Sequence, residues 1–131
     1  MRFSFLILLA ALSAAARAEL PAVQLTAGMH AIRAEVADTM GTRMEGLMYR
    51  KSMPQNAGMV FVFDEVSTHC MWMKNTNIPL SVAFIDDAGA IVNIEDMQPH
   101  TEQSHCAKKP VRFADRKSTR LNSSHGYISY A

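Results

Sequence analysis

Residues His69–Phe84, HCMWMKNTNIPLSVAF, form the stretch that most restricts how this 131-residue chain can fold. It contains the single tryptophan, Trp72, and ends in an almost uninterrupted apolar run over Leu80–Phe84. The lysine, asparagines, threonine and proline between the two apolar parts favour a turn. The stretch therefore predicts two strands joined by a short polar loop, and a core built on a sheet.

The first 18 residues have the pattern of a secretory signal peptide. Arg2 gives a positive start, Phe3–Ala16 is almost wholly apolar, and Ala16-Arg17-Ala18 is a small-x-small cleavage pattern. The apolar run is shorter than the roughly 20 residues that a spanning helix needs, which disfavours a membrane anchor. We expect cleavage after Ala18 and a mature protein in the periplasm or outside the cell, without a membrane span.

The charge of the chain disfavours one class of function. Residues 19–114 contain eight basic and eleven acidic residues, which gives a net charge of −3. Since the basic residues form no stripe, nucleic-acid binding has no electrostatic basis. We expect the partner to be a small molecule or a component of the cell envelope.

One short helix is expected over Met40–Tyr49. Its apolar residues recur with helical spacing and form one face, at Met40, Met44, Leu47 and Met48. Asp38-Thr39 offers capping side chains, and Thr42 with Glu45 forms a possible capping box one turn later. Gly46 lowers helix propensity, and we expect it to let the helix pack closely on a sheet.

The remaining elements are predicted to be strands joined by turns, with a polar loop at Gln98–Lys109. A strand, a helix and then a run of strands favour an α+β fold with a mainly antiparallel, curved or barrel-like sheet. The expected strands are Val23–Thr26, His30–Ala37, Met59–Phe63, Thr68–Met73, Leu80–Asp86, Ala90–Met97 and Pro110–Phe113, with a turn at Asp64–Ser67.

Several blocks of the sequence resemble the signature of one bacterial and archaeal family, domain of unknown function 192. They are GLMYR at Gly46–Arg50, GMVFVF at Gly58–Phe63, WMKNT at Trp72–Thr76, IPL at Ile78–Leu80 and PVRFA at Pro110–Ala114. The resemblance covers roughly His30–Ala114. It implies a small β-rich α+β domain, often exported, and brings no established activity.

The chain departs from the family pattern at two places. Ser81 stands where family members often carry aspartate. After Ala114 the family continues with a Leu-Glu pair and a Gly-Trp-Phe segment, which are absent here, and residues 115–131 resemble an adapter-derived tail. We therefore expect a single domain over 19–114, a non-native tail over 115–131, and a sheet that lacks its closing segment.

Cys70 and Cys106 are the only cysteines, and in an exported chain they are expected to form a disulfide. Closing this loop would contribute about 4 kcal/mol in the chain-entropy model. Each cysteine follows a histidine, His69 or His105, so a zinc site is the alternative. Adjacent side chains on a strand point to opposite faces, and the four groups would converge poorly.

The loop after Trp72 is the candidate ligand-binding site. Lys74 and Asn75 beside an indole could hold a carboxylate or a sugar edge, with Thr76 and Arg50 in the same cluster. The alternative is a structural turn, in which Asn75 bonds the backbone, Lys74 is solvated and Arg50 complements the helix dipole. The residues leave both interpretations open.

His69, Met71 and Met73 share one face of a strand and could ligate Cu(I), which is the alternative cofactor in a chain otherwise expected to need none. The simpler interpretation is that methionines fill the core, here and at Met40, Met44 and Met48 on the helix. A small hydrolase is a second alternative, but the sequence brings together no catalytic pair. We favour a non-catalytic binding or accessory domain.

Overall fold

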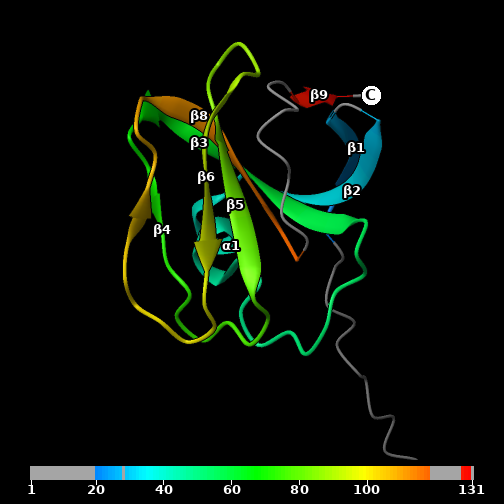
Figure 1. Cartoon of the computed structure of the whole chain (residues 1–131), viewed down its shortest axis with the longest axis vertical. Coiled ribbons are helices and arrows are strands. Elements are labelled where there is room, and N and C mark those ends of the chain that lie inside the picture. The colour runs from blue at the N-terminus through cyan, green and yellow to red at the C-terminus, as the bar shows by residue number, and fades with distance from the viewer. Residues whose placement is uncertain (1–19, 28, 119–127, 131) are drawn as a thin grey trace, which may run out of the picture.

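A computed structural model describes residues 20–27, 29–118 and 128–130 (Figure 1). The expected signal peptide, and residues 119–127 and 131 of the expected tail, lie outside this part of the chain. The elements are β1 Ala22–Ala27, β2 His30–Ala37, α1 Met40–Glu45, β3 Ala57–Ser67, β4 Cys70–Met71, β5 Leu80–Ile85, β6 Ile91–Met97, β7 His105–Cys106, β8 Val111–Lys117 and β9 Ile128–Tyr130.

Seven of the described strands form one curved sheet in the order β6-β5-β8-β3-β2-β1-β9, and β4 pairs with β7 in a separate ribbon (Figure 1). All neighbours are antiparallel except β2 and β3. Parallel strands need a longer crossover, and α1 lies in the connection between these two. The expected α+β fold with a mainly antiparallel, curved sheet and one short helix is confirmed. The sheet is open, so the barrel-like alternative is wrong.

The core lies on both faces of the sheet. Strand β5 is buried along its whole length, with Leu80, Val82 and Phe84 on one face and Ala83 and Ile85 on the other. Successive side chains on a strand alternate between faces, so an uninterrupted apolar run fits a strand covered on both sides. The first face also packs residues from β3, β8 and the segment after α1, namely Met59, Phe61, Val111, Ala114 and Leu47.

Helix α1 is shorter than predicted and is capped differently. The Thr39 hydroxyl accepts a hydrogen bond from the Thr42 amide at 3.2 Å, and the Thr39 amide donates to the Thr42 hydroxyl at 3.1 Å. Thr42 thus closes the box that starts at Thr39, and the predicted box with Glu45 is wrong. The helix ends at Glu45 because Gly46 adopts a φ of 51°. As expected, Gly46 packs on the sheet, since a Cβ there would lie 3.2 Å from the Phe61 ring.

Two predicted boundaries around the central stretch are wrong. The segment Asp64–Ser67 belongs to β3, where the pairing with β8 changes register between Val62 and Ser67. The predicted strand Thr68–Met73 pairs only over β4, because its sole described strand partner is the two-residue β7 within the predicted polar loop. Met71 and Met73 share a buried face, as the predicted alternation requires, whereas Cys70 and Trp72 on the other face are exposed.

Strand β8 continues to Lys117, three residues beyond the predicted end of the domain. Asp115 on this strand is completely buried, opposite Val60 on β3 and Ala83 on β5. Neither carboxylate oxygen has a hydrogen-bond partner among the described residues. Burial raises the pKa of Asp115 to about 7, and nearby Lys117 partly offsets this rise. In the part of the chain that the structure describes, no helix is long and apolar enough to cross a membrane.

Candidate functional site

A cavity of about 740 Å³ lies between α1, β4 and the loop after Trp72. Trp72, Lys74, Asn75 and Thr76 all line it, so the structure brings together four of the five residues predicted for ligand binding. Helix α1 and the segment after it supply one wall, and the rings of Phe61 and Phe63 on β3 belong to the lining. The cavity is thus formed by elements that are far apart in the sequence.

Large apolar side chains around the cavity are exposed to solvent. The exposed fraction is 72% for Met40, 70% for Met44, 65% for Tyr49 and 44% for Trp72. The expectation that Met40 and Met44 fill the core is wrong, because no residue of α1 is buried. Only Leu47, after the chain has left the helix at Gly46, reaches the core. An exposed apolar cluster of this kind is typical of a binding surface.

The backbone of the predicted site forms a tight turn that is fastened to the end of the helical segment. Asn75 has a φ of 52°, and its carbonyl oxygen accepts a hydrogen bond from the Tyr49 amide at 2.9 Å. The Asn75 side-chain amide donates to the Tyr49 hydroxyl at 3.1 Å. Thr76 is buried and its hydroxyl donates to the Lys74 carbonyl at 3.0 Å. Asn75 and Thr76 therefore have structural roles in the turn as well as lining the cavity.

Lys74 differs from its neighbours in this turn because its side chain remains exposed. The Lys74 ammonium lies 5.2 Å from the centre of the Trp72 ring, in a cation–π arrangement. Among the described residues, no carboxylate forms an ion pair with Lys74. The rim of the cavity thus presents a cation beside an aromatic ring.

Arg50, the fifth predicted residue, does not line the cavity. Its guanidinium binds Glu35 on β2 through two hydrogen bonds, one of them 2.9 Å between Nη2 and Oε1. The hydrogen bond to Glu35 raises the pKa of Arg50, while partial burial lowers it. This arginine therefore fastens the segment after α1 to the sheet.

Sequence reasoning missed Arg116, which lines the cavity from β8 and is only 4% exposed. Its Nη2 donates to the Trp72 carbonyl at 3.1 Å and lies 2.9 Å from the Met73 sulfur, whereas Nε has no hydrogen-bond partner in the described part of the chain. Burial lowers the pKa of Arg116 to about 10, so it stays charged at neutral pH. The residue falls within the predicted tail. The one signal in the sequence is the alternation of side chains along a strand, which places Arg116 on the same face of β8 as Ala114.

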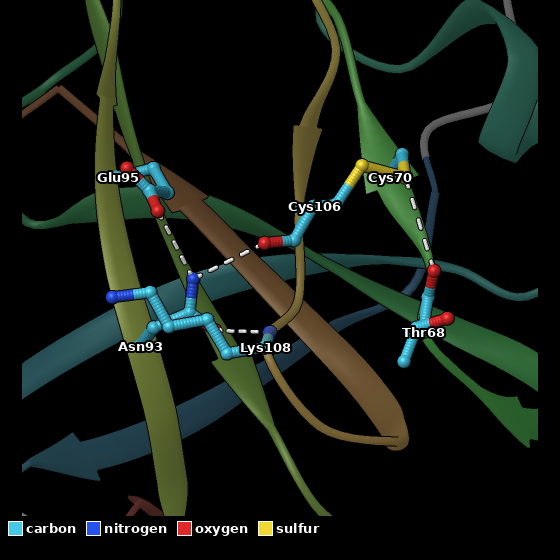
Figure 2. The surroundings of a disulfide bond; sticks show 6 residues. All are labelled: Thr68, Cys70, Asn93, Glu95, Cys106 and Lys108. Carbon is cyan, nitrogen blue, oxygen red and sulfur yellow. Dashed lines mark hydrogen bonds between the residues drawn. A yellow bond between two sulfur atoms is a disulfide. The ribbon is translucent and has the colours of Figure 1, made fainter.

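The predicted disulfide between Cys70 and Cys106 is present and joins β4 to β7. Figure 2 shows how Asn93 on β6 fastens this ribbon to the sheet. The Asn93 amide donates to the Cys106 carbonyl at 3.3 Å, and its oxygen accepts from the Lys108 amide at 3.0 Å. Cys70 also lines the cavity, so one wall of the cavity depends on the disulfide.

The three residues of the copper alternative have different surroundings. The His69 ring stacks on Phe63 with 3.7 Å between centroids, and Nε2 lies 2.9 Å from the Glu65 carbonyl oxygen. Met71 lines the cavity, and Met73 is buried with its sulfur against Arg116. Within the described ranges, no three His, Cys, Asp or Glu side chains gather in a way that could hold a metal ion.

Ser81, which replaces the aspartate implied by the resemblance, lies on β5 opposite Asp96 on β6. The Ser81 hydroxyl donates to the Asp96 carboxylate at 2.6 Å. An aspartate at 81 would place two carboxylates side by side, so serine suits its neighbour in this chain. Ser81 does not line the cavity, and the departure leaves the candidate site unchanged.

The fold and the site define a small α+β domain in which a short helix and a disulfide-linked ribbon enclose an apolar cavity against an open sheet. The family model of domain of unknown function 192, described as "Uncharacterized ACR", matches residues 23–116. The chain belongs to this family. Among curated proteins, none matches the chain.

Two solved structures are similar to this chain over most of their length. A protein from Sinorhizobium meliloti 1021, described as a proposed transcription regulator, is 34% identical, with a TM-score of 0.75 over 83% of this chain and 92% of its own. A protein of unknown function from Novosphingobium aromaticivorans DSM 12444 is 27% identical, with a TM-score of 0.77 over 84% of this chain and 86% of its own. The chain therefore shares its fold with both proteins.

Proposed function

We propose that this chain is an exported, non-catalytic domain that binds a small apolar or amphiphilic molecule in the cavity between α1 and the Trp72–Thr76 turn. One observation carries the proposal: the cavity of about 740 Å³ is lined by methionine and aromatic side chains. Small-molecule sites in proteins are typically cavities of about 300–1,000 Å³ with mainly hydrophobic linings and a few polar groups.

The methionines suit an adaptable site. Met40, Met44, Met48 and Met71 line the cavity from α1, from the segment after it and from β4. The unbranched, polarizable side chain of methionine fits surfaces of varied shape. Exposed methionines on a short helix would lose contact with water when a ligand binds, which supplies a hydrophobic driving force.

Export is the second part of the proposal. The signal-peptide pattern of residues 1–18 supports it, and so does the disulfide, because disulfides persist mainly in oxidising compartments outside the cytosol. The regulator description of the S. meliloti protein is not carried over to this chain, because residues 19–114 have a net charge of −3 and no basic stripe. A small ligand agrees better with the apolar lining.

The test uses protein recovered from the exported fraction, whose N-terminus we expect at Glu19. Trp72 is the only tryptophan and lines the cavity, so its fluorescence reports on binding there. We expect the neutral apolar probe N-phenyl-1-naphthylamine to bind and to change the Trp72 emission. The double variant Met40→Lys, Met44→Lys should lose this binding, since it places two charges on the apolar wall.

Val66 provides the matched control, because it is an exposed apolar residue on β3 that does not line the cavity. The variant Val66→Lys should bind the probe as the unmodified chain does. Equal binding by the Met40/Met44 variant would contradict the proposal, as would no binding by the unmodified, folded protein.

A further inference from the structure

We propose that the ligand of this cavity is an apolar carboxylate, with its acidic group at the Lys74 side and its apolar body on the methionine wall. The inference rests on the proposed function and adds the chemical class of the ligand. It follows from the charges of the lining, which among the described residues contains three cations, Arg43, Lys74 and Arg116, and one carboxylate, Glu45.

Arg43 is occupied by protein groups and is not available to a ligand. Its Nη1 donates to the Asp38 carbonyl at 2.7 Å and to the Val62 carbonyl at 3.0 Å. Its Nη2 binds the Asp64 carboxylate at 3.0 Å. This arginine fastens α1 to β3, so the excess of positive charge in the cavity comes from the other two cations.

Lys74 and Arg116 lack a protein counterion among the residues that the structure describes. Arg116 is the more telling of the two, because its guanidinium is buried over the Phe61 ring, 5.6 Å from the ring centre. Its Nη2 meets a carbonyl and a thioether, and its Nε has no hydrogen-bond partner among the described residues. A buried charge without a counterion is costly, and an anionic ligand in the cavity would relieve that cost. Lys74 supplies a second, solvent-accessible cation at the rim.

Tyr49 adds a neutral donor at the same rim. Its hydroxyl accepts from the Asn75 amide at 3.1 Å, which leaves the hydroxyl proton available to a second acceptor. Lys74 belongs to the same turn as Asn75, and both line the cavity with Tyr49. A carboxylate has only acceptors when ionised, so it complements a rim built from donors.

The opposite part of the lining selects the rest of the ligand. Met40, Met44 and Met48 contribute thioether side chains with no hydrogen-bond donors. A hydrocarbon or aromatic body would cover these residues, while a fully polar acid would leave them in water. The class that satisfies both parts of the cavity is therefore an amphiphile with one carboxylate, whether a free acid or the acyl part of a lipid breakdown product.

The test compares three probes that share a ten-carbon chain and differ in the head group: decanoate, decanol and decyltrimethylammonium. Binding is followed by Trp72 fluorescence at concentrations below micelle formation. We expect decanoate to bind at least about tenfold more tightly than decanol, which is the scale of a hydrogen bond to a charged group. The ammonium compound should bind most weakly, because it meets cations at the rim.

Single variants measure the contribution of each cation separately. This matters because Arg116 lies in the predicted tail and Lys74 does not. Lys74→Gln should reduce the preference for decanoate over decanol several-fold and leave decanol binding unchanged. Arg116→Met should do the same, with unfolding in urea showing that the variant is folded. Lys51→Gln, an exposed lysine outside the cavity, is the control and should retain the full preference.

Equal affinity for decanoate and decanol, or a preference that survives in Lys74→Gln, would overturn the inference and leave the proposed function intact. Failure of all three compounds and of the naphthylamine probe to bind would overturn both.

Discussion

Strand β5 and helix α1 are both six residues long, and they differ completely in burial. Every residue of β5 is buried, whereas no residue of α1 is. The strand lies between β6 and β8 in the sheet and packs on both faces, while no residue of the helix belongs to either core cluster. The comparison shows that the buried sheet supplies the core of this domain, whereas the helix supplies an exposed wall of the cavity.

The β4–β7 ribbon is intermediate between these two regions. It has only two residue pairs, and the disulfide and Asn93 fasten it in place. Such a short ribbon is not stable by itself, so local links substitute for a large core. The cavity lies where α1 and the ribbon cover the sheet incompletely.

The sharpest test of the comparison is a pair of truncations, one in each element. Phe84→Ala removes a fully buried ring from β5 and should lower the free energy of unfolding by about 3–5 kcal/mol. Met44→Ala on α1 should change it by less than about 0.5 kcal/mol, since Met44 is exposed, and should weaken binding of the naphthylamine probe. Urea unfolding measures both changes, and similar losses for the two variants would contradict the contrast.

The ribbon is tested by removing the disulfide with the double variant Cys70→Ser, Cys106→Ser. The link closes a 36-residue separation, so we expect a loss of about 4 kcal/mol in the chain-entropy model. Probe binding should fall with it, because Cys70, Met71 and Trp72 line one wall of the cavity. Dithiothreitol should destabilise the unmodified protein similarly and leave the double variant unaffected. A loss below about 1 kcal/mol would mean that backbone pairing alone fixes the ribbon.

Asp115 is an exception within the buried part of the sheet, because it places a carboxyl group between Val60 and Ala83. Burial raises its pKa to about 7, so the folded protein keeps this proton at pH values where the unfolded chain has released it. The contribution of Asp115 to stability should therefore be largest below pH 4 and fall by about 4 kcal/mol as the pH rises through 7, after which this group adds no further change.

Asp115→Asn isolates this effect, since it keeps the shape of the side chain and cannot ionise. The difference in the free energy of unfolding between the two proteins, measured in urea from pH 4 to pH 8, should grow in favour of the asparagine variant. A difference that stays constant with pH would show that the carboxyl group reaches water or a counterion in solution.

Periodicity in the sequence predicted most strands of the sheet, but it did not predict where the short elements α1 and β4 end. Strand β2 has the predicted bounds, and β5 and β6 each differ from prediction by one residue, because their apolar patterns are strong and local. Helix α1 ends four residues before its predicted end. The apolar spacing of Leu47 and Met48 continues the helical pattern, but the positive φ of Gly46 ends the helix. Strand β4 was shortened because pairing requires a partner strand, and β7 offers only two residues.

In the candidate site, too, the sequence predicted some residues correctly and misplaced others. The sequence identified the turn from Trp72 to Thr76 and the cysteine pair, because their residue types carry specific chemistry. It misplaced Arg50, since a basic side chain at a helix end does not reveal its partner, which is Glu35 on β2.

By itself the sequence determined the α+β class through the spacing of its apolar residues, the family through the resemblance of its signature blocks, and the disulfide through its two cysteines. Only the tertiary structure decided that Met40 and Met44 line a cavity instead of the core, and that Arg116 lines the same cavity without a counterion among the described residues. The physical reason is that periodicity tells which residues share a face, whereas the distance between two faces depends on every element packed between them.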